Sequence, residues 1–193
     1  TACAGIIVGV VVKTGLGLSL ANSLVKLAGG SIMLTLFLVM IASLVLGMGA
    51  PTTANYVITS TIAAPAIITL LSPNTPMELV PLVTVMSAHF FVFYFGIIAD
   101  ITPPVALAAF AASGISGGDP ILTGVNSAKL AIAAFIIPYM IVLQPALLMV
   151  DVTIPQIIWV TFSAIIGMVG IGAGIIGYWY RKLIWFERII LIA

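Results

Sequence analysis

The 193-residue sequence is 63% hydrophobic and only 6% charged, with a formal net charge of +1. Soluble domains carry about 25% charged residues, so water cannot solvate a surface made from this composition. The composition excludes a soluble domain, and the lack of basic stripes excludes a nucleic-acid-binding protein. We expect no nucleic acid partner, and we expect the lipid bilayer to be the environment of the chain.

Uncharged stretches of helical length follow one another along the chain. A membrane-crossing helix needs about 20 apolar residues, and the sequence provides this length several times. The pattern predicts an all-α, polytopic membrane protein. In chain order we expect apolar segments at 2–28, 31–47, 54–71, 79–99, 105–113, 128–150, 154–180 and 183–193, and a polar loop at 114–127.

The few charged residues predict the orientation of these segments. Lys and Arg favour the cytoplasmic side of a membrane. Arg181 and Lys182 therefore place the end of segment 154–180 inside. Counting back through the segments then places the loops that hold Glu78 and Asp151 outside.

The first interruption of a predicted helix lies at residues 47–55. Pro51 removes a backbone donor, and Gly47 and Gly49 loosen the turn before it. A break exposed to lipid would leave backbone groups unpaired, so this break must be buried in protein or line a water-filled cavity. We predict a re-entrant helical hairpin over 31–71 with this break at its tip.

The second interruption lies at residues 100–104. Pro103 and Pro104 cannot continue a helix, and a residue before proline, here Thr102, is pushed out of the α region. We predict a discontinuous helix over 79–113 with an extended linker. The alternative is that both breaks are simple kinks in packed spans.

Paired helix breaks in a membrane protein indicate a transporter binding site. Unwound carbonyls and helix C-termini attract cations, whereas helix N-termini attract anions. Carbonyl and hydroxyl oxygens suit sodium, the only metal that we expect, as a coupling ion; we expect no cofactor. The sodium-binding candidates are the residues that form the two breaks: Gly47, Gly49, Pro51, Thr52, Thr53, Thr102 and Pro103.

Three polar side chains are candidates for substrate binding. Asp100 is an acid near membrane depth, where ionisable residues are functional by default; the alternative is an acid that caps the next helix. Asn55 can offer its amide to a carboxylate or its oxygen to sodium, or else join two helices by a hydrogen bond. His89 can contact substrate, or else be a packed, hydrogen-bonded histidine. A zinc site or an aspartyl protease needs more ligands or acids than these, so we do not expect an enzyme.

Three stretches resemble a known transporter family. They are GMGAPTTANYVI at 47–58, HFFVFYFGIIADITPPVALAAFAASGISGGDP at 89–120 and KLAIAAFIIPY at 129–139. The sequence is similar to the C-terminal part of the large permease subunit of TRAP (tripartite ATP-independent periplasmic) transporters, of the type in which small and large subunits are fused. The resemblance covers most of the chain. We expect a piece of a longer protein, because the sequence starts and stops inside apolar runs.

The resemblance implies the second inverted repeat of an elevator-type ion transporter. It divides the chain into a membrane helix at 1–28, part of the transport domain at 29–127 and C-terminal membrane helices at 128–193. It also implies sodium-coupled import of organic acids across the inner membrane of a bacterium or archaeon. The implied partners are a periplasmic solute-binding protein and a small membrane subunit or its fused equivalent. The alternatives are another cation-coupled carrier and a structural or assembly subunit that does not transport.

Overall fold

The structure is a computed structural model that describes residues 2–49, 51–150 and 152–192. These described residues form helices and connecting turns, with one isolated bridge between Tyr178 and Lys182 and no strand. Among them, three helices are long and apolar enough to cross a membrane, and a bent pair of helices provides a fourth candidate. The prediction of an all-α, polytopic membrane protein is confirmed.

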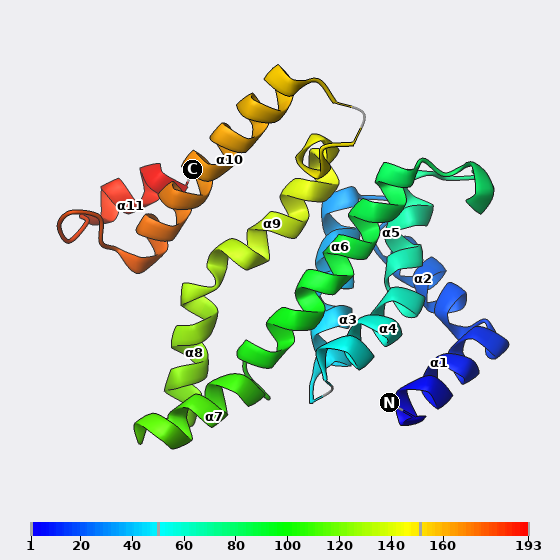
Figure 1. Ribbon diagram of the computed structural model, residues 1–193, viewed down its shortest axis with the longest axis horizontal. Helices are drawn as coiled ribbons and strands as arrows, with labels where there is room; N and C mark the ends of the chain where they lie inside the picture. The colour runs from blue at the N-terminus through cyan, green and yellow to red at the C-terminus, as the bar shows by residue number, and fades with distance from the viewer. Residues whose placement is uncertain (1, 50, 151, 193) are drawn as a thin grey trace.

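Figure 1 shows the helices in chain order from the blue N-terminus to the red C-terminus. Those outside the two predicted breaks are α1 (Ala2–Thr14), α2 (Leu16–Leu27), η1 (Met77–Leu79), α8 (Pro120–Leu130), α9 (Ile132–Leu143), η3 (Pro145–Leu148), α10 (Ile154–Ile176) and α11 (Trp185–Ile192), where η marks a 3₁₀ helix.

A helical hairpin occupies the predicted range 31–71. Its first arm is α3 (Ile32–Gly47), and its second arm is α4 (Thr52–Ile62), which α5 (Ala64–Leu71) continues after a short irregularity. Pro51 directly precedes α4, a place that suits proline because the first amides of a helix have no intrahelical acceptor. The two arms pack against each other, and the tip between them points to the lower end of Figure 1.

The discontinuous helix is also present. Its first part is α6 (Leu82–Ile98), which tightens into the 3₁₀ helix η2 (Ala99–Ile101). Thr102 is extended, with φ −108° and ψ 128°, as expected for a residue before proline. The second part, α7 (Leu107–Ser116), starts after Ala106 and therefore begins and ends a little later than the expected helix.

The prediction of a polar loop over 114–127 is wrong, because much of this segment is helical. Asp119 caps the first turn of α8 by accepting a hydrogen bond from a backbone amide, and proline follows it. An acid followed by proline is a strong start signal for a helix, and here it outweighs the glycine-rich composition. α8 bends by 41° into α9, which runs back along α6, and η3 then replaces the end of the helix expected over 128–150.

Two other expected helices are interrupted or shortened by glycines in the left-handed conformation. Gly15 has φ 67° and divides the segment expected at 2–28 into α1 and α2. Gly177 has φ 76° and ends α10 before the end of the segment expected at 154–180. Both corrections have the same cause, since a glycine at positive φ ends a helix without the steric cost that other residues meet.

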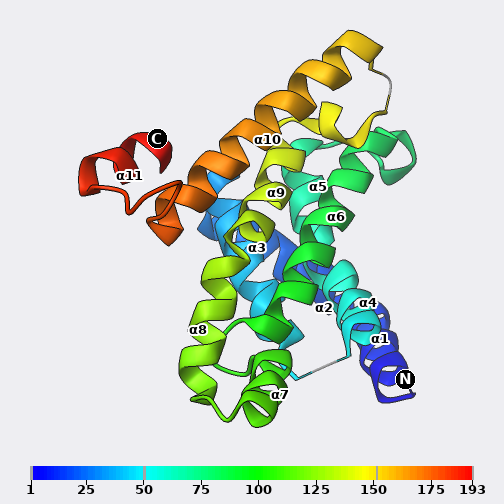
Figure 2. The same cartoon turned by 60° about the vertical axis from the view of Figure 1, so that its left-hand side comes forward.

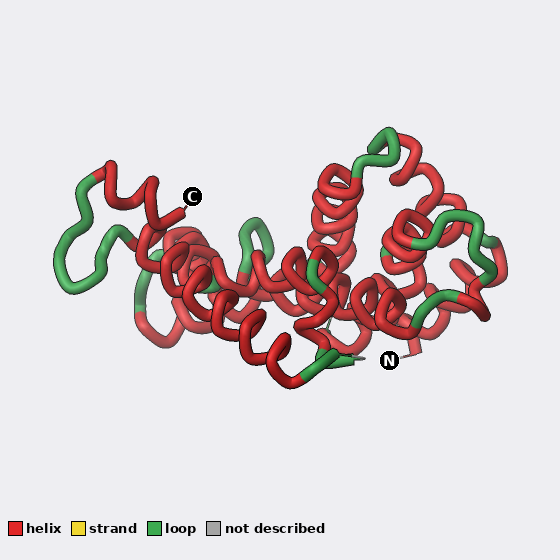
Figure 3. Tube along the Cα trace, turned by 90° about the horizontal axis from the view of Figure 1, so that it is seen from above, coloured by secondary structure: helices red, strands yellow, loops and turns green. Residues whose placement is uncertain are grey.

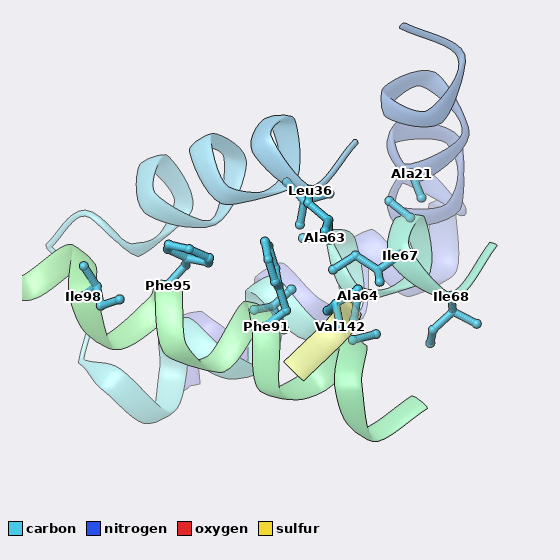
Figure 4. Close-up of a cluster of buried hydrophobic side chains, with 14 residues drawn as sticks. Ala21, Leu36, Ala63, Ala64, Ile67, Ile68, Phe91, Phe95, Ile98 and Val142 are labelled. Atoms are coloured by element: carbon cyan, nitrogen blue, oxygen red, sulfur yellow. The ribbon is translucent and has the colours of Figure 1, made fainter. Parts of the chain in front are cut away.

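The main core lies between the hairpin and α6, and α9 contributes to it (Figure 4). Leu36 on α3, Ile67 on α5, and Phe91 and Phe95 on α6 are fully buried there, and Val142 on α9 packs with them. By contrast, α10 exposes most of its apolar side chains. With α11 it forms the C-terminal end of the molecule in Figure 1, and Figure 3 shows the same end from above. The two helix breaks thus belong to the well-packed half of the chain.

Candidate binding site at the two helix breaks

The two helix breaks lie next to each other. Gly49 and Pro51 at the hairpin tip, Asp100 in η2, and Leu107 and Ala108 in the first turn of α7 line one open cavity of about 410 Å³. Figure 2 shows the tip beside the junction of α6 and α7. Segments about 50 residues apart in the sequence therefore form one candidate site.

Two helices begin at this cavity. α4 starts at Thr52 and α7 at Leu107, and neither start is capped by a hydrogen bond from a side chain. The first amides of a helix have no intrahelical acceptor and carry a partial positive charge, so they attract anions. The side chains of Thr52 and Thr53 are exposed at the start of α4. The cavity thus offers free amides beside the carboxylate of Asp100, and Thr52 and Thr53 directly follow the lining residue Pro51.

Thr102 and Pro103 lie on a second, smaller cavity. Together with Ala99, the last turns of α3 and the following residue Met48, they line a mainly apolar space of about 170 Å³. The hydroxyl group of Thr102 donates a hydrogen bond to the carbonyl of Ile98 at 2.7 Å. Of the sodium-binding candidates, the structure therefore places Gly49 and Pro51 on the cavity with Asp100, and Thr102 and Pro103 on the cavity with α3. Thr52 and Thr53 line neither cavity.

Gly47 packs behind the tip and lines neither cavity. A methyl group at Gly47 would overlap the side-chain nitrogen of Asn55 and lie 2.8 Å from the Cβ atom of Ala99. Asn55 is fully buried, and its Nδ2 donates a hydrogen bond to the carbonyl of Gly96 at 2.7 Å. Its Oδ1 is buried without a hydrogen-bond partner in the structure. Asn55 thus joins α4 to α6 and does not itself line the cavity that holds Asp100.

His89 lies farther along α6, away from the tip. It is 11 residues before Asp100, which is about 16 Å along a helix at 1.5 Å per residue. Its Nδ1 is hydrogen-bonded to the hydroxyl group of Tyr56 at 3.0 Å. His89 and Tyr56 line a separate hollow with Phe90 and Phe93. The structure does not bring His89 to the cavity with Asp100, and its contact with substrate stays a prediction.

Sequence reasoning missed three participants in this region. Leu107 and Ala108 line the cavity because Ala106 delays the start of α7. Gly96 takes part through its carbonyl group, which accepts a hydrogen bond from Asn55, 41 positions earlier in the chain. No spacing pattern reports such a long-range backbone contact, although a glycine inside an apolar helix signals a close approach in membrane proteins.

A polytopic helical protein in which a hairpin tip and a broken helix line one cavity belongs to the class of membrane permeases, because transporters build their binding sites from such discontinuous helices. The family described as the DctM component of the tripartite ATP-independent periplasmic transporter matches residues 1–157. The chain belongs to this family, so it is a TRAP-transporter permease and a multi-pass membrane protein. The same comparisons found no matching curated protein and no matching solved structure.

The family match confirms the resemblance to the large permease component of TRAP transporters, whereas the assignment to its C-terminal part stays a prediction. The family consists of transporters rather than enzymes. Residues 158–193, which hold most of α10 and all of α11, lie outside the match. The expectation that the chain comes from a fused form also stays a prediction.

Proposed function

We propose that this chain is part of a sodium-coupled permease that imports small organic acids. In this proposal a periplasmic solute-binding protein delivers the substrate, and a small membrane subunit or its fused equivalent completes the permease. The membrane is the inner membrane of a bacterium or archaeon. The observation that carries the proposal is the single cavity lined by the hairpin tip, Asp100 and the first turn of α7.

The chemistry of this cavity suits a cation and an anion together. Sodium prefers hard oxygen ligands, which the backbone carbonyls of the tip and the carboxylate of Asp100 offer. The free amides at the starts of α4 and α7 offer hydrogen bonds to a carboxylate. No arginine is among the described residues that line the cavity, so in this half of the site an organic acid is held by backbone amides, with Thr52 and Thr53 next to the lining residue Pro51. A bound sodium ion lowers the cost of placing an anion in a poorly solvated site.

Uptake by the intact transporter tests the proposal. The complete permease that contains this chain, with its membrane partner, is reconstituted in liposomes and supplied with radiolabelled mono- and dicarboxylates through the binding protein. We expect accumulation that needs an inward sodium gradient and stops when choline replaces sodium or when the binding protein is omitted. Uptake that needs neither sodium nor the binding protein contradicts the proposal. Uptake driven by a proton gradient in choline supports the alternative of another cation-coupled carrier.

A further inference from the structure

One buried amide joins the two helix breaks immediately behind the cavity. Asn55, in the second turn of α4, donates a hydrogen bond of 2.7 Å to the carbonyl of Gly96 in the last turn of α6. Asn55 is completely buried and lines none of the cavities described above. Its side-chain nitrogen already donates to a protein acceptor, and its side-chain oxygen is buried and does not face either cavity at the breaks. We therefore seek its contribution in the position of the helices.

The helices approach closely at this point because two glycines leave room for the amide. A methyl group at Gly47, the last residue of α3, would overlap Nδ2 of Asn55. A methyl group at Gly96 would lie 3.3 Å from the same nitrogen, which is tighter than ordinary van der Waals contact. The end of α3, the start of α4 and the end of α6 therefore meet at one side chain.

The residues of this contact lie within about one helical turn of residues that line the cavity. Asn55 lies four residues after Pro51, and Gly96 lies four residues before Asp100. Four residues are about one helical turn. Gly47 lies two residues before Gly49. On each of the three elements the contact is therefore next to, and just behind, a residue that lines the cavity.

Tyr56, the next residue along α4, makes a second contact between α4 and α6. Tyr56 is hydrogen-bonded to His89 at 3.0 Å and packs edge-on against Phe93, with ring centroids 5.5 Å apart. This second attachment lies about two turns farther from the break than Gly96. It can keep α4 on α6 when the Asn55 contact is lost, but it cannot set the spacing at the break itself.

We propose that Asn55 is a positioning residue: its hydrogen bond to Gly96 sets the distance between the hairpin tip and Asp100, and hence the geometry of the cation site. The inference rests on the proposed sodium-coupled function and assigns Asn55 a role other than direct substrate binding. Loss of the bond lets the tip move relative to the 3₁₀ turn that holds Asp100. Sodium binding then weakens while the helices stay folded, because the core residues of α3 and α5 lie farther from the break and α9 still packs against α6.

The variants Asn55→Asp and Asn55→Ala test the inference in the intact transporter purified with its partners. Asp has the same shape as Asn but presents only acceptors to the Gly96 carbonyl when ionised, whereas Ala removes the side chain beyond Cβ. Gly96→Ala is a milder variant that keeps both hydrogen-bonding groups and pushes them apart. Ser60→Ala, on the same helix, is the matched control, because the hydroxyl group of Ser60 bonds only within α4.

The probe is sodium chloride against choline chloride at constant ionic strength. Hydrogen–deuterium exchange reports on residues 48–53 and 97–102, and the sodium concentration for half-maximal protection reports on the cation site. In choline we expect both Asn55 variants to exchange faster in these two segments than the wild type. We expect half-maximal protection to need about two- to tenfold more sodium, the range for loss of one hydrogen bond. Gly96→Ala should shift in the same direction by less, and Ser60→Ala should not shift.

The possible outcomes distinguish the positioning role of Asn55 from a purely structural role and from a failure of the proposed sodium coupling. A purely structural role would lower the melting temperature in choline and leave the sodium dependence unchanged, which overturns the positioning role. Unchanged exchange at 97–102 in the Asn55 variants overturns the contact itself. If the Asn55 variants do not fold, Gly96→Ala provides the test. An unchanged sodium dependence of Gly96→Ala would then overturn the inference. A wild-type protein that sodium does not protect contradicts the proposed sodium coupling, whereas the exchange measured in choline still tests the contact.

Discussion

Asp100 differs from the other acidic residues of the chain in its surroundings. It lies in a 3₁₀ turn between an apolar helix and a double proline, and it is the acid that lines the cavity with the hairpin tip. Asp119, by comparison, is exposed and caps α8. An ionisable group in a membrane-spanning segment is costly to keep without a function, so the surroundings of Asp100 support its role at the site.

At the residue scale, substitution of a polar group that lines the cavity, or of one directly beside a lining residue, should weaken sodium coupling. Asp100→Asn removes a negative charge from the cavity, and Thr52→Ala removes a hydroxyl oxygen at the start of α4. We expect each change to raise the sodium concentration for half-maximal uptake by about tenfold, as for a lost charge-assisted contact of about 1.4 kcal/mol. Sodium-dependent uptake in liposomes measures the effect.

The matched control for these two variants is Asp119→Asn. Asparagine caps a helix about as well as aspartate, so this change alters a carboxylate outside the site without loss of the cap. It should leave the sodium dependence unchanged. If Asp100→Asn and Thr52→Ala also leave it unchanged, the cation site lies elsewhere in the transporter.

At the scale of elements, capping decides where several helices begin and end. Proline or the Asp119 side chain starts α4 and α8, and glycines at positive φ end α7 and α10. These signals are local, so the hairpin and the broken helix could be predicted from the sequence. The start of α8 is also signalled locally, by Asp119 followed by proline, although the glycine-rich composition around it is typical of a loop.

The contact between α10 and α11 is a cap of a different kind, because the capping group comes from another helix. The guanidinium group of Arg188 on α11 donates to the carbonyls of Gly174 and Ile175 at the end of α10, both at 2.8 Å. Gly177 leaves room for this guanidinium group, which a methyl group there would approach to 3.1 Å. The last carbonyls of a helix lack intrahelical donors and carry partial negative charge, so a cation stabilises them.

Arg188→Ala should therefore release α11 from α10. Loss of these hydrogen bonds from a charged donor should cost about 2 kcal/mol, or about 30-fold in the opening equilibrium. Hydrogen–deuterium exchange of residues 185–192 in the intact transporter measures this opening. Arg181→Ala is the control, because Arg181 forms only an exposed ion pair with Glu187, and such pairs contribute little. Equal effects of the two changes would contradict the capping role.

At the scale of the whole molecule, packing is uneven. The hairpin, α6 and α9 share the main core, whereas α10 is largely exposed in this chain. Phe95 shows how the core is built: it is fully buried and packs against Phe91 on its own helix and against Phe135 and Tyr139 on α9. These aromatic contacts hold α9 on the helix that carries the break.

Phe95→Ala should destabilise the protein, because it leaves a cavity between α6 and α9. We expect a loss of about 3 kcal/mol in the free energy of unfolding, measured by thermal or denaturant unfolding in detergent. Phe162→Ala on α10 is the control, since Phe162 is 61% exposed and its loss leaves no internal cavity. A similar loss in both variants would show that the exposed face of α10 is packed in the intact transporter.

The sequence by itself determined the class of protein, the family resemblance and both helix breaks. Low charge and long apolar runs require a bilayer, and proline and glycine interrupt helices through local backbone sterics, so these features need no tertiary information. The approximate places of Asp100, Thr52 and the hairpin tip followed from the same local signals.

Only the tertiary structure decided which of these residues share a cavity. It placed Asp100 with Gly49 and Pro51, put Thr102 on a neighbouring cavity, and joined Asn55 to Gly96 rather than exposing it at the tip. These outcomes depend on how close α3, α4 and α6 approach and on which face each helix turns to the others. The packing of side chains from distant parts of the chain sets both the distance between the helices and the faces that meet. The sequence of a single helix does not determine either one.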